Sequence, residues 1–244
     1  MREAAVPVKL WDLPVRLIHW GFVVLLPLLW WSAESGRLGL HKTFGLVMLT
    51  LVVTRLLWGL VGSSTARFDG FLRGPRAILD YLKGRGETAR APVVGHNPLG
   101  GWSVMAMLTL LGAQVALGLV TQDVDGLESG PLNSLVSWDT AEAAREAHEL
   151  LFNLILALVV LHLAAIAFYR FVRKDDLVRP MVTGRRRFSE AVAPPHLAPL
   201  WRAALCAVLA AALAGWVWLG APPFGARYPW DQPALAPLDA ADYM

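Results

Sequence analysis

The chain has 244 residues, of which 56% are apolar, and carries a net charge of +3 at pH 7. Its mean hydropathy of +0.48 is too high for a soluble domain of this length. The basic residues lie in clusters between apolar runs. Their excess therefore reflects membrane topology, and we expect no nucleic-acid partner. The only cysteine, Cys206, lies within an apolar run, which excludes an intramolecular disulfide.

Five apolar runs are long enough to cross a bilayer. They cover approximately Val15–Ala33, Leu40–Val61, Gly101–Thr121, Arg145–Phe171 and Leu200–Gly220. The first run could also be read as a secretory signal. It is long for one, however, and Trp30 and Trp31 stand where small cleavage-site residues belong, so we expect it to be retained. The sequence predicts an all-α membrane protein.

The distribution of Lys and Arg predicts the orientation. Of the 22 basic residues, seventeen fall in the N-terminal segment, in 62–100 and in 170–202, and four fall on the opposite side. Short cytoplasmic segments carry this excess. We therefore expect a multi-pass protein of the bacterial inner membrane, with a cytoplasmic N-terminus and a periplasmic C-terminus.

The segments between the spans give weaker signals. Residues 71–83 are expected to form an amphipathic helix on the membrane surface, with Pro75 in its first turn. The external loop 122–144 is acidic and is expected to be irregular, whereas Arg185–Arg187 are expected only to anchor the fourth span. The tail 222–244, rich in Pro and Asp, has no periodicity and is expected to be extended or disordered.

The fifth span carries a stripe of small residues at four-residue spacing, which allows close helix packing in lipid. The stripe consists of Ala203, Ala207, Ala211 and Gly215. It can pack against the chain's own bundle, or it can serve self-association as a homodimer.

Four histidines lie within the expected spans, where ionisable side chains are costly and usually functional. His148 and His162 are fourteen residues apart on the fourth span, so their rings share a face and lie about 21 Å apart along the axis. His19 begins the first span at the depth of His162, and His41 begins the second at the depth of His148. Topology therefore pairs His19 with His162 near the cytoplasm and His41 with His148 near the outside.

Two imidazoles at one depth can occupy both axial positions of a haem iron, which favours electron transfer over oxygen activation. The four histidines predict two haem b groups per chain, and the absence of a Cys-x-x-Cys-His motif excludes covalent attachment. For His41 and His148, near the boundary, the alternative is a simple interfacial residue. His96 and His196 lie outside the spans, and both are expected to be solvated interfacial residues.

Two arginines are candidate partners for the propionates of the inner haem. Arg55 shares a face with His41 at the depth of His162, and Arg16 is one turn before His19. The alternatives are a snorkelling side chain for Arg55 and an ordinary cytoplasmic flank for Arg16.

A metal transporter is a further alternative for the same histidines. It would need ligands that converge near the midplane, whereas these ligands divide into two groups about 21 Å apart.

The sequence resembles the bacterial cytochrome b561 family, which includes the b-type cytochrome subunits of nickel–iron hydrogenases. The resemblance covers about residues 9–187. The motifs that carry it are WDLPVRLIHW at 11–20, LHKTFG at 40–45, RLLWG at 55–59, GHNPLGGW at 95–102, HELLFN at 148–153 and Leu161-His162. It implies a four-helix transmembrane bundle with two b haems, here held by His19, His41, His148 and His162. These haems would move electrons between a quinone pool and a redox partner.

The resemblance ends before the fifth span. We therefore expect a haem-binding domain at 1–187, a linker with the fifth helix at 188–221 and an external tail at 222–244. An acidic external face could attract a basic partner such as a soluble c-type cytochrome, or it could simply be solvated. Its carboxylates are Asp123, Asp125, Glu128, Asp139, Glu142, Glu146, Asp231, Asp239 and Asp242.

An alternative function is that of a haem-containing membrane anchor for a peripheral hydrogenase or dehydrogenase. The anchor stands against a stand-alone electron-transfer cytochrome with quinone-linked oxidoreductase activity.

Overall fold

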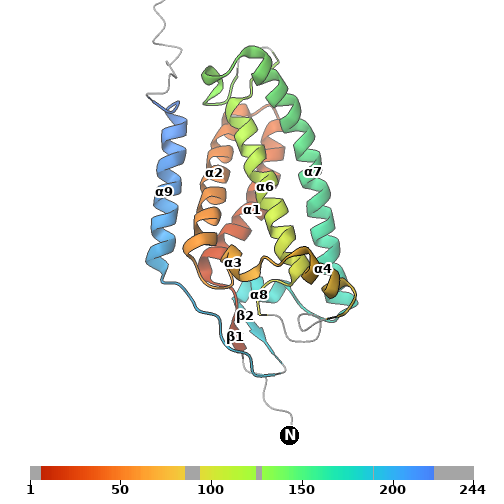
Figure 1. Ribbon diagram of the computed structural model, residues 1–244. Helices are drawn as coiled ribbons and strands as arrows, with labels where there is room; N and C mark the ends of the chain where they lie inside the picture. The colour runs from red at the N-terminus through yellow and green to blue at the C-terminus, as the bar shows by residue number, and fades with distance from the viewer. Residues whose placement is uncertain (1–6, 86–93, 125–127, 189, 223–244) are drawn as a thin grey trace, which may run out of the picture.

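The computed structural model describes residues 7–85, 94–124, 128–188 and 190–222. In this part of the chain, five helices are long and apolar enough to cross a membrane. They are α1 (Leu13–Glu34), α2 (Leu38–Val61), α6 (Pro98–Val120), α7 (Trp138–Phe171) and α9 (Leu200–Trp218). The first four form a bundle and α9 stands beside it (Figure 1). The all-α prediction of a four-helix bundle plus a fifth helix is confirmed.

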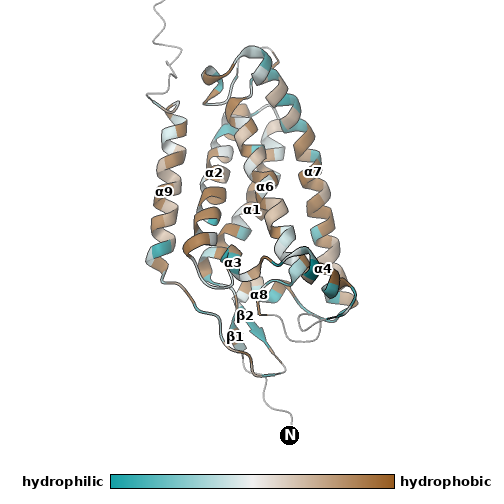
Figure 2. Cartoon of the chain, in the orientation of Figure 1, coloured by the Kyte–Doolittle hydropathy of each residue, from teal (hydrophilic) through white to brown (hydrophobic). Residues whose placement is uncertain are grey.

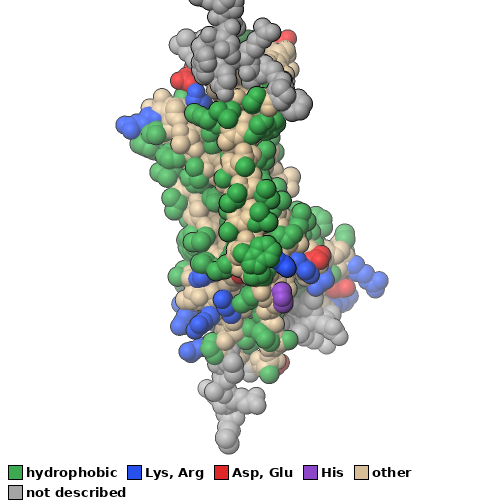
Figure 3. Space-filling model, turned by 90° about the vertical axis from the view of Figure 1, so that its left-hand side faces the viewer, with side chains coloured by type: hydrophobic (Ala, Val, Ile, Leu, Met, Phe, Trp, Pro, Cys, Tyr) green, Lys and Arg blue, Asp and Glu red, His purple; other side chains and the backbone are tan. Residues whose placement is uncertain are grey.

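The long helices are hydrophobic along most of their length (Figure 2), and many of their large apolar side chains are exposed. Leu150, Val160 and Leu161 are each more than 60% exposed. Such a surface is stable against lipid and not against water. Figure 3 shows the corresponding apolar band over one side of the molecule, with Lys and Arg gathered mainly at the lower end. The protein is a multi-pass membrane protein.

The bundle consists of two helical hairpins. Helix α1 packs closely on α2, and α6 packs closely on α7, whereas the two hairpins meet more loosely through α2 and α6. Gly36 adopts a left-handed conformation, with φ of 64°, and so permits the tight turn between α1 and α2. The histidines of α1 and α2 thus belong to one hairpin, and both histidines of α7 belong to the other.

Helix α7 begins at Trp138, earlier than the expected start near Arg145. Ser137 caps it by accepting a hydrogen bond from the Thr140 amide at 3.3 Å. The segment after the cap combines alanines with charged residues. It forms helix readily, but its low hydropathy places it outside the predicted span. At 34 residues, or about 51 Å, α7 is longer than the hydrocarbon is thick. Part of α7 therefore extends beyond the hydrocarbon, and the short helix η1 (Asn133–Leu135) lies shortly before it.

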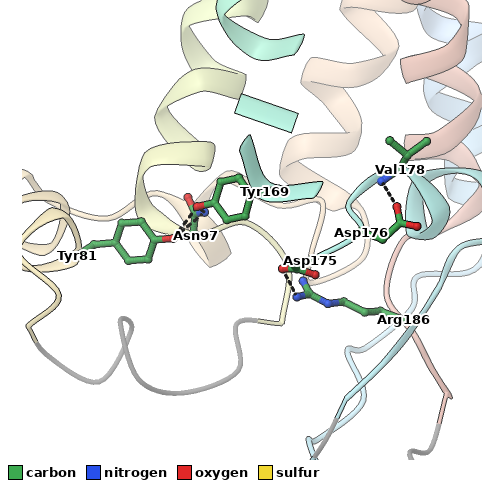
Figure 4. Close-up of polar contacts among 7 residues, drawn as sticks. All are labelled: Tyr81, Asn97, Tyr169, Asp175, Asp176, Val178 and Arg186. Carbon is green, nitrogen blue, oxygen red and sulfur yellow. Dashed lines mark hydrogen bonds and ion pairs between the residues drawn. The ribbon is translucent and has the colours of Figure 1, made fainter. Parts of the chain in front are cut away.

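The lower end is closed by a two-stranded antiparallel sheet of β1 (Pro7–Lys9) and β2 (Arg185–Arg187), with Val8 opposite Arg186. The expectation that the three arginines only anchor the fourth span was therefore wrong, because this triplet is a paired strand. Arg186 also forms an ion pair with Asp175 at 2.7 Å (Figure 4). Helices α3 (Phe68–Phe71) and α8 (Val178–Thr183) complete this end.

The surface helix expected over 71–83 is α4 (Pro75–Leu82), which is shorter than expected at its start and has Pro75 in its first turn as predicted. Three polar side chains fix it to the bundle (Figure 4). The hydroxyls of Tyr81 on α4 and Tyr169 on α7 are 2.7 Å apart, and the Asn97 amide donates to both. Burial, and then the bond to Tyr169, raise the pKa of Tyr81 to about 12. Asn97 also caps α6, because its Oδ1 accepts from the Gly100 amide.

Helix α9 packs on α2 through a face of small and medium residues: Cys206, Ala210, Ala214 and Val217. The expected stripe lies beside this face, with Ala211 and Gly215 exposed. The segment before α9 is also attached, since Phe188 and Ala198 join Cys206 in one apolar cluster with Trp11 and Trp58. The acidic and proline-rich tail beyond residue 222 lies outside the described residues.

Candidate functional site

The start of α1 is fixed by Asp12, which is buried and makes two hydrogen bonds. Its carboxylate accepts from the Val15 amide at 2.8 Å, which caps the helix, and from Trp58 Nε1 of α2 at 2.9 Å. Asp12 thus sets the position of α1 relative to α2. His19 lies two turns further along α1, so this cap also sets how deep in the bundle His19 lies.

His41 and His148 face each other at the upper end of the bundle. Their ring centroids are 6.2 Å apart and their planes are nearly perpendicular, at 77°. His41 is in the first turn of α2, and His148 lies on α7 above the level at which the helix becomes wholly apolar. We call these two residues the outer pair.

Each ring of the outer pair is held by a backbone carbonyl. His41 Nδ1 lies 2.9 Å from the carbonyl oxygen of Leu29 on α1, and His148 Nδ1 lies 2.9 Å from that of Gln114 on α6. A carbonyl only accepts, so both Nδ1 atoms carry the proton. The Nε2 atom of each ring is therefore left with a free lone pair, as a metal ligand needs.

Two small residues make room for this arrangement. A Cβ at Gly118 would lie 3.0 Å from Cε1 of His148, so only glycine leaves the ring undisturbed. Ser32 is fully buried, and its hydroxyl donates to the same Leu29 carbonyl that holds His41. The sequence gives no signal for the two carbonyls, and neither Gly118 nor Ser32 belongs to a motif noted above.

His19 and His162 form the second group, which we call the inner pair. They lie close enough to interact electrostatically and approach from different hairpins. Unlike the outer rings, neither inner ring has a hydrogen bond within the described part of the chain, and His19 Nδ1 is fully buried. The indole of Trp20 lies edge-on to His19 at 5.3 Å, and its Nε1 donates to the Met181 carbonyl.

Arg16 and Arg55 both lie at the lower end, but in different surroundings. Arg16 donates to the Val182 carbonyl at 2.6 Å, and its Nε atom is buried without a partner among the described residues. Arg55 is only 5% exposed, donates to the Ala66 carbonyl at 3.2 Å and lies over the Phe68 ring. Arg55 is therefore buried in the α2–α3 corner, which rules out a snorkelling side chain.

His96, expected as a solvated interfacial residue, is instead enclosed by aromatic rings. Its ring centroid lies 4.7 Å from those of both Trp11 and Phe71. Burial, and then the nearby charge of Arg55, lower the pKa of His96 to about 3. The expectation was wrong because His96, two residues before α6, packs between Trp11 and Phe71.

The described residues contain no group of three or more His, Cys, Asp or Glu side chains able to hold a metal ion. The histidines instead form two pairs at opposite ends of a membrane bundle. Neutral imidazoles are ligands for haem iron, so each pair could hold an iron-containing cofactor between helices.

Residues 10–184 match the family model described as prokaryotic cytochrome b561, and the chain belongs to this family. A relative from Bradyrhizobium diazoefficiens, described as a probable Ni/Fe-hydrogenase B-type cytochrome subunit, is 22% identical over 218 residues. That match covers 75% of this chain and 87% of the relative. No solved structure matches the chain at a significant level. The protein is therefore a membrane haem b electron carrier.

The outer pair fits a bound haem on geometric grounds. Imidazole nitrogens bind first-row metals at about 2 Å, so two rings on opposite sides of one iron have centroids about 6 Å apart. The centroid separation of 6.2 Å between His41 and His148 agrees with this distance. The protonated Nδ1 atoms point away to carbonyls, which leaves Nε2 for the iron.

Proposed function

We propose that the chain binds two b haems, one between His41 and His148 and one between His19 and His162, and carries electrons across the membrane. The spacing and hydrogen bonding of the outer pair carry this proposal. The inner pair supports the proposal because His19 and His162 lie at the same depth on different hairpins. The haems, when bound, supply irons that gain and lose one electron.

The protein's part in this function is to hold the four histidines in place and to exclude reactions of the iron with oxygen or substrate. His41 with His148, and His19 with His162, would each hold one iron and would leave it no open position for oxygen or substrate. The Leu29 and Gln114 carbonyls fix the tautomer and orientation of the outer rings. His148 and His162 lie fourteen residues apart on one helix, or about 21 Å, which is most of the hydrocarbon thickness.

Arg16 is the better placed of the two candidate propionate partners. Its buried Nε atom has no acceptor in the described structure, and Arg16 precedes His19 by one turn. Arg55 already has the Ala66 carbonyl and lies within electrostatic range of Asp12. A propionate contact from Arg55 would add to these contacts.

The distribution of basic residues supports a cytoplasmic N-terminus and a periplasmic C-terminus in a bacterial inner membrane. In this orientation the outer pair is near the periplasm. Quinone is the proposed partner within the membrane, and a basic c-type cytochrome is the proposed soluble partner at the external face. Homodimer formation through the exposed faces of α9 belongs to the same proposal, as does the division into 1–187, 188–221 and 222–244.

A second candidate function is favoured by the name of the Bradyrhizobium diazoefficiens relative. In this version the chain is the haem-containing anchor of a peripheral hydrogenase or dehydrogenase. The two versions share the haem sites and differ in the partner. A metalloenzyme that co-purifies with the native chain, in constant proportion, would favour the anchor.

The test of the proposed function is a reduced-minus-oxidised optical spectrum of the purified chain together with a count of extracted haem. We expect a low-spin b-type spectrum and two haems per chain. One haem per chain would contradict the paired arrangement. Failure to bind haem after expression with ample haem would contradict the proposed function altogether.

A further inference from the structure

A groove lies at the lower end of the bundle, between the last turns of α7 and the short helix α8 (Figure 1). Its volume is about 530 Å³, which is within the range of about 300–1,000 Å³ usual for small-molecule sites. Exposed apolar side chains from both helices line it, and exposed apolar grooves are typical of ligand or lipid contact. These side chains are Leu163, Phe171, Val178 and Val182.

Two arginines line the same groove. Arg170 lies in the last turn of α7 and Arg179 lies on α8, and both are exposed. Within the described part of the chain, neither guanidinium forms an ion pair or a hydrogen bond. Guanidinium groups bind phosphate oxygens through paired, charge-assisted hydrogen bonds. The groove therefore combines an apolar lining with two arginines that are free to bind a phosphate.

Asp176 is the one carboxylate among the described residues that line the groove. Its Oδ1 accepts from the amides of Val178 and Arg179, each at 3.1 Å, and Figure 4 shows the bond to Val178. Asp176 thus serves the start of α8 and does not pair with either arginine. Two arginines and one aspartate leave the lining with a net charge of +1. This charge matches the single negative charge of a phosphodiester.

Two side chains of α1 hold α8 at the surface of the bilayer. Arg16 donates to the Val182 carbonyl at 2.6 Å, and Trp20 Nε1 donates to the Met181 carbonyl at 3.3 Å. Indole rings prefer the boundary between the hydrocarbon and the headgroups, so Trp20 indicates the depth of α8. The arginines of the groove therefore lie at the level of lipid phosphates.

The groove also extends into the hydrocarbon. Leu163 lies seven residues before Arg170 on α7, or about 10 Å along the helix axis. This direction, from the charged boundary toward the middle of the bilayer, is the direction that an acyl chain takes from its headgroup.

We propose that the groove between α7 and α8 binds one anionic phospholipid, with its phosphate between Arg170 and Arg179 and an acyl chain along Leu163 and Val182. An anionic lipid is preferred over a zwitterionic one because the lining is positively charged. The bound lipid connects the end of α7 to α8 and so stabilises this end of the bundle. The proposal goes beyond electron transfer and holds whether or not haem is bound.

The experiment is native mass spectrometry of the purified full chain in detergent, titrated with phosphatidylglycerol or with phosphatidylcholine. The wild type should hold one phosphatidylglycerol per chain and should bind phosphatidylcholine more weakly. Each arginine near an anionic headgroup contributes about fivefold in affinity, so Arg170→Gln with Arg179→Gln should weaken phosphatidylglycerol binding about 25-fold. Val178→Trp, which fills the groove and keeps both arginines, should weaken it as well.

The matched control is the double variant Arg76→Gln with Lys83→Gln. It removes the same charge from exposed positions at the two ends of α4, which does not line the groove. Its affinity for phosphatidylglycerol should equal that of the wild type.

Four outcomes would overturn the proposal. Equal losses in the two double variants would show a general attraction of lipid to the basic end, without a site. Equal binding of both lipids by the wild type would contradict the preference for an anion. Unchanged binding in Val178→Trp would show that no acyl chain lies in the groove. Displacement of the lipid by millimolar inorganic phosphate would show a site for a free anion. The haem content of each variant, measured separately by its optical spectrum, tests the proposed function independently.

Discussion

Individual backbone carbonyls and a single glycine determine how the outer histidines are held. The Leu29 and Gln114 carbonyls accept from the two rings, and Gly118 lies against His148. Because protein interiors are closely packed, one added methyl group at such a contact displaces the ring. The outer site should therefore be more sensitive to residues around the histidines than hydropathy suggests.

Gly118→Val should remove the outer haem and reduce the count from two haems per chain to one. The added side chain needs the space that His148 occupies, since a Cβ alone would be 3.0 Å from Cε1. Gly112→Ala is the matched control on the same helix, because a Cβ there would meet Val52 at an ordinary 4.0 Å. An unchanged spectrum and two haems in Gly118→Val would show that the ring does not stand where described.

His96 should make the protein sensitive to acid. In the folded state its pKa is about 3, against an ordinary value of 6.5. Between these values the unfolded chain binds a proton that the folded chain does not. The contribution of His96 to the free energy of unfolding is therefore fully present above pH 6.5. It falls as the pH drops toward 3, by at most about 1.4 kcal/mol per pH unit.

His96→Phe should retain the stacking with Trp11 and Phe71 and remove this part of the acid sensitivity. The measurement is the thermal unfolding midpoint in detergent between pH 7 and pH 4. The midpoint of the variant should fall less than that of the wild type. Parallel curves for the two proteins would contradict the buried, neutral state of His96.

The helices are positioned by caps that also act between elements. Asp12 caps α1 and accepts from Trp58 of α2, and Asn97 caps α6 and binds the tyrosines of α4 and α7. Both residues lie in motifs that the sequence already singled out. Their partners were not readable, because the partners belong to distant segments.

Asp12→Ala should destabilise the protein more than an ordinary cap substitution. Loss of the cap costs about 1 kcal/mol, and the buried Trp58 Nε1 left without an acceptor costs about 1–3 kcal/mol more. Ser137→Ala, which removes only the exposed cap of α7, is the matched control. Equal losses in unfolding temperature for the two variants would show that the Trp58 bond contributes nothing.

For the molecule as a whole, the sequence predicts what the membrane dictates. Bilayer thickness sets helix length, so the five spans and the depths of His19, His41, His148 and His162 were readable from hydropathy and spacing. Features outside the hydrocarbon were not readable in this way. The early start of α7, the pairing of Arg185–Arg187 with β1 and the burial of His96 depend on contacts between segments far apart in the chain. Hydropathy carries no information on such contacts.

The fifth helix shows the same limit. Its length and composition predicted a span, whereas its packing face was displaced from the expected stripe, because contact with α2 selects Cys206, Ala210 and Ala214. The linker before α9 shares an apolar cluster with the bundle through Phe188 and Ala198. The fifth helix is therefore attached to the bundle along its linker as well as its span.

The pairing of the histidines is tested most directly by two double variants compared for haem content. His41→Ala with His148→Ala removes both ligands of one proposed site and should leave one haem per chain. His41→Ala with His162→Ala removes one ligand from each site and should leave none. If the first variant loses both haems, or the second retains one at full occupancy, the two-site arrangement is contradicted.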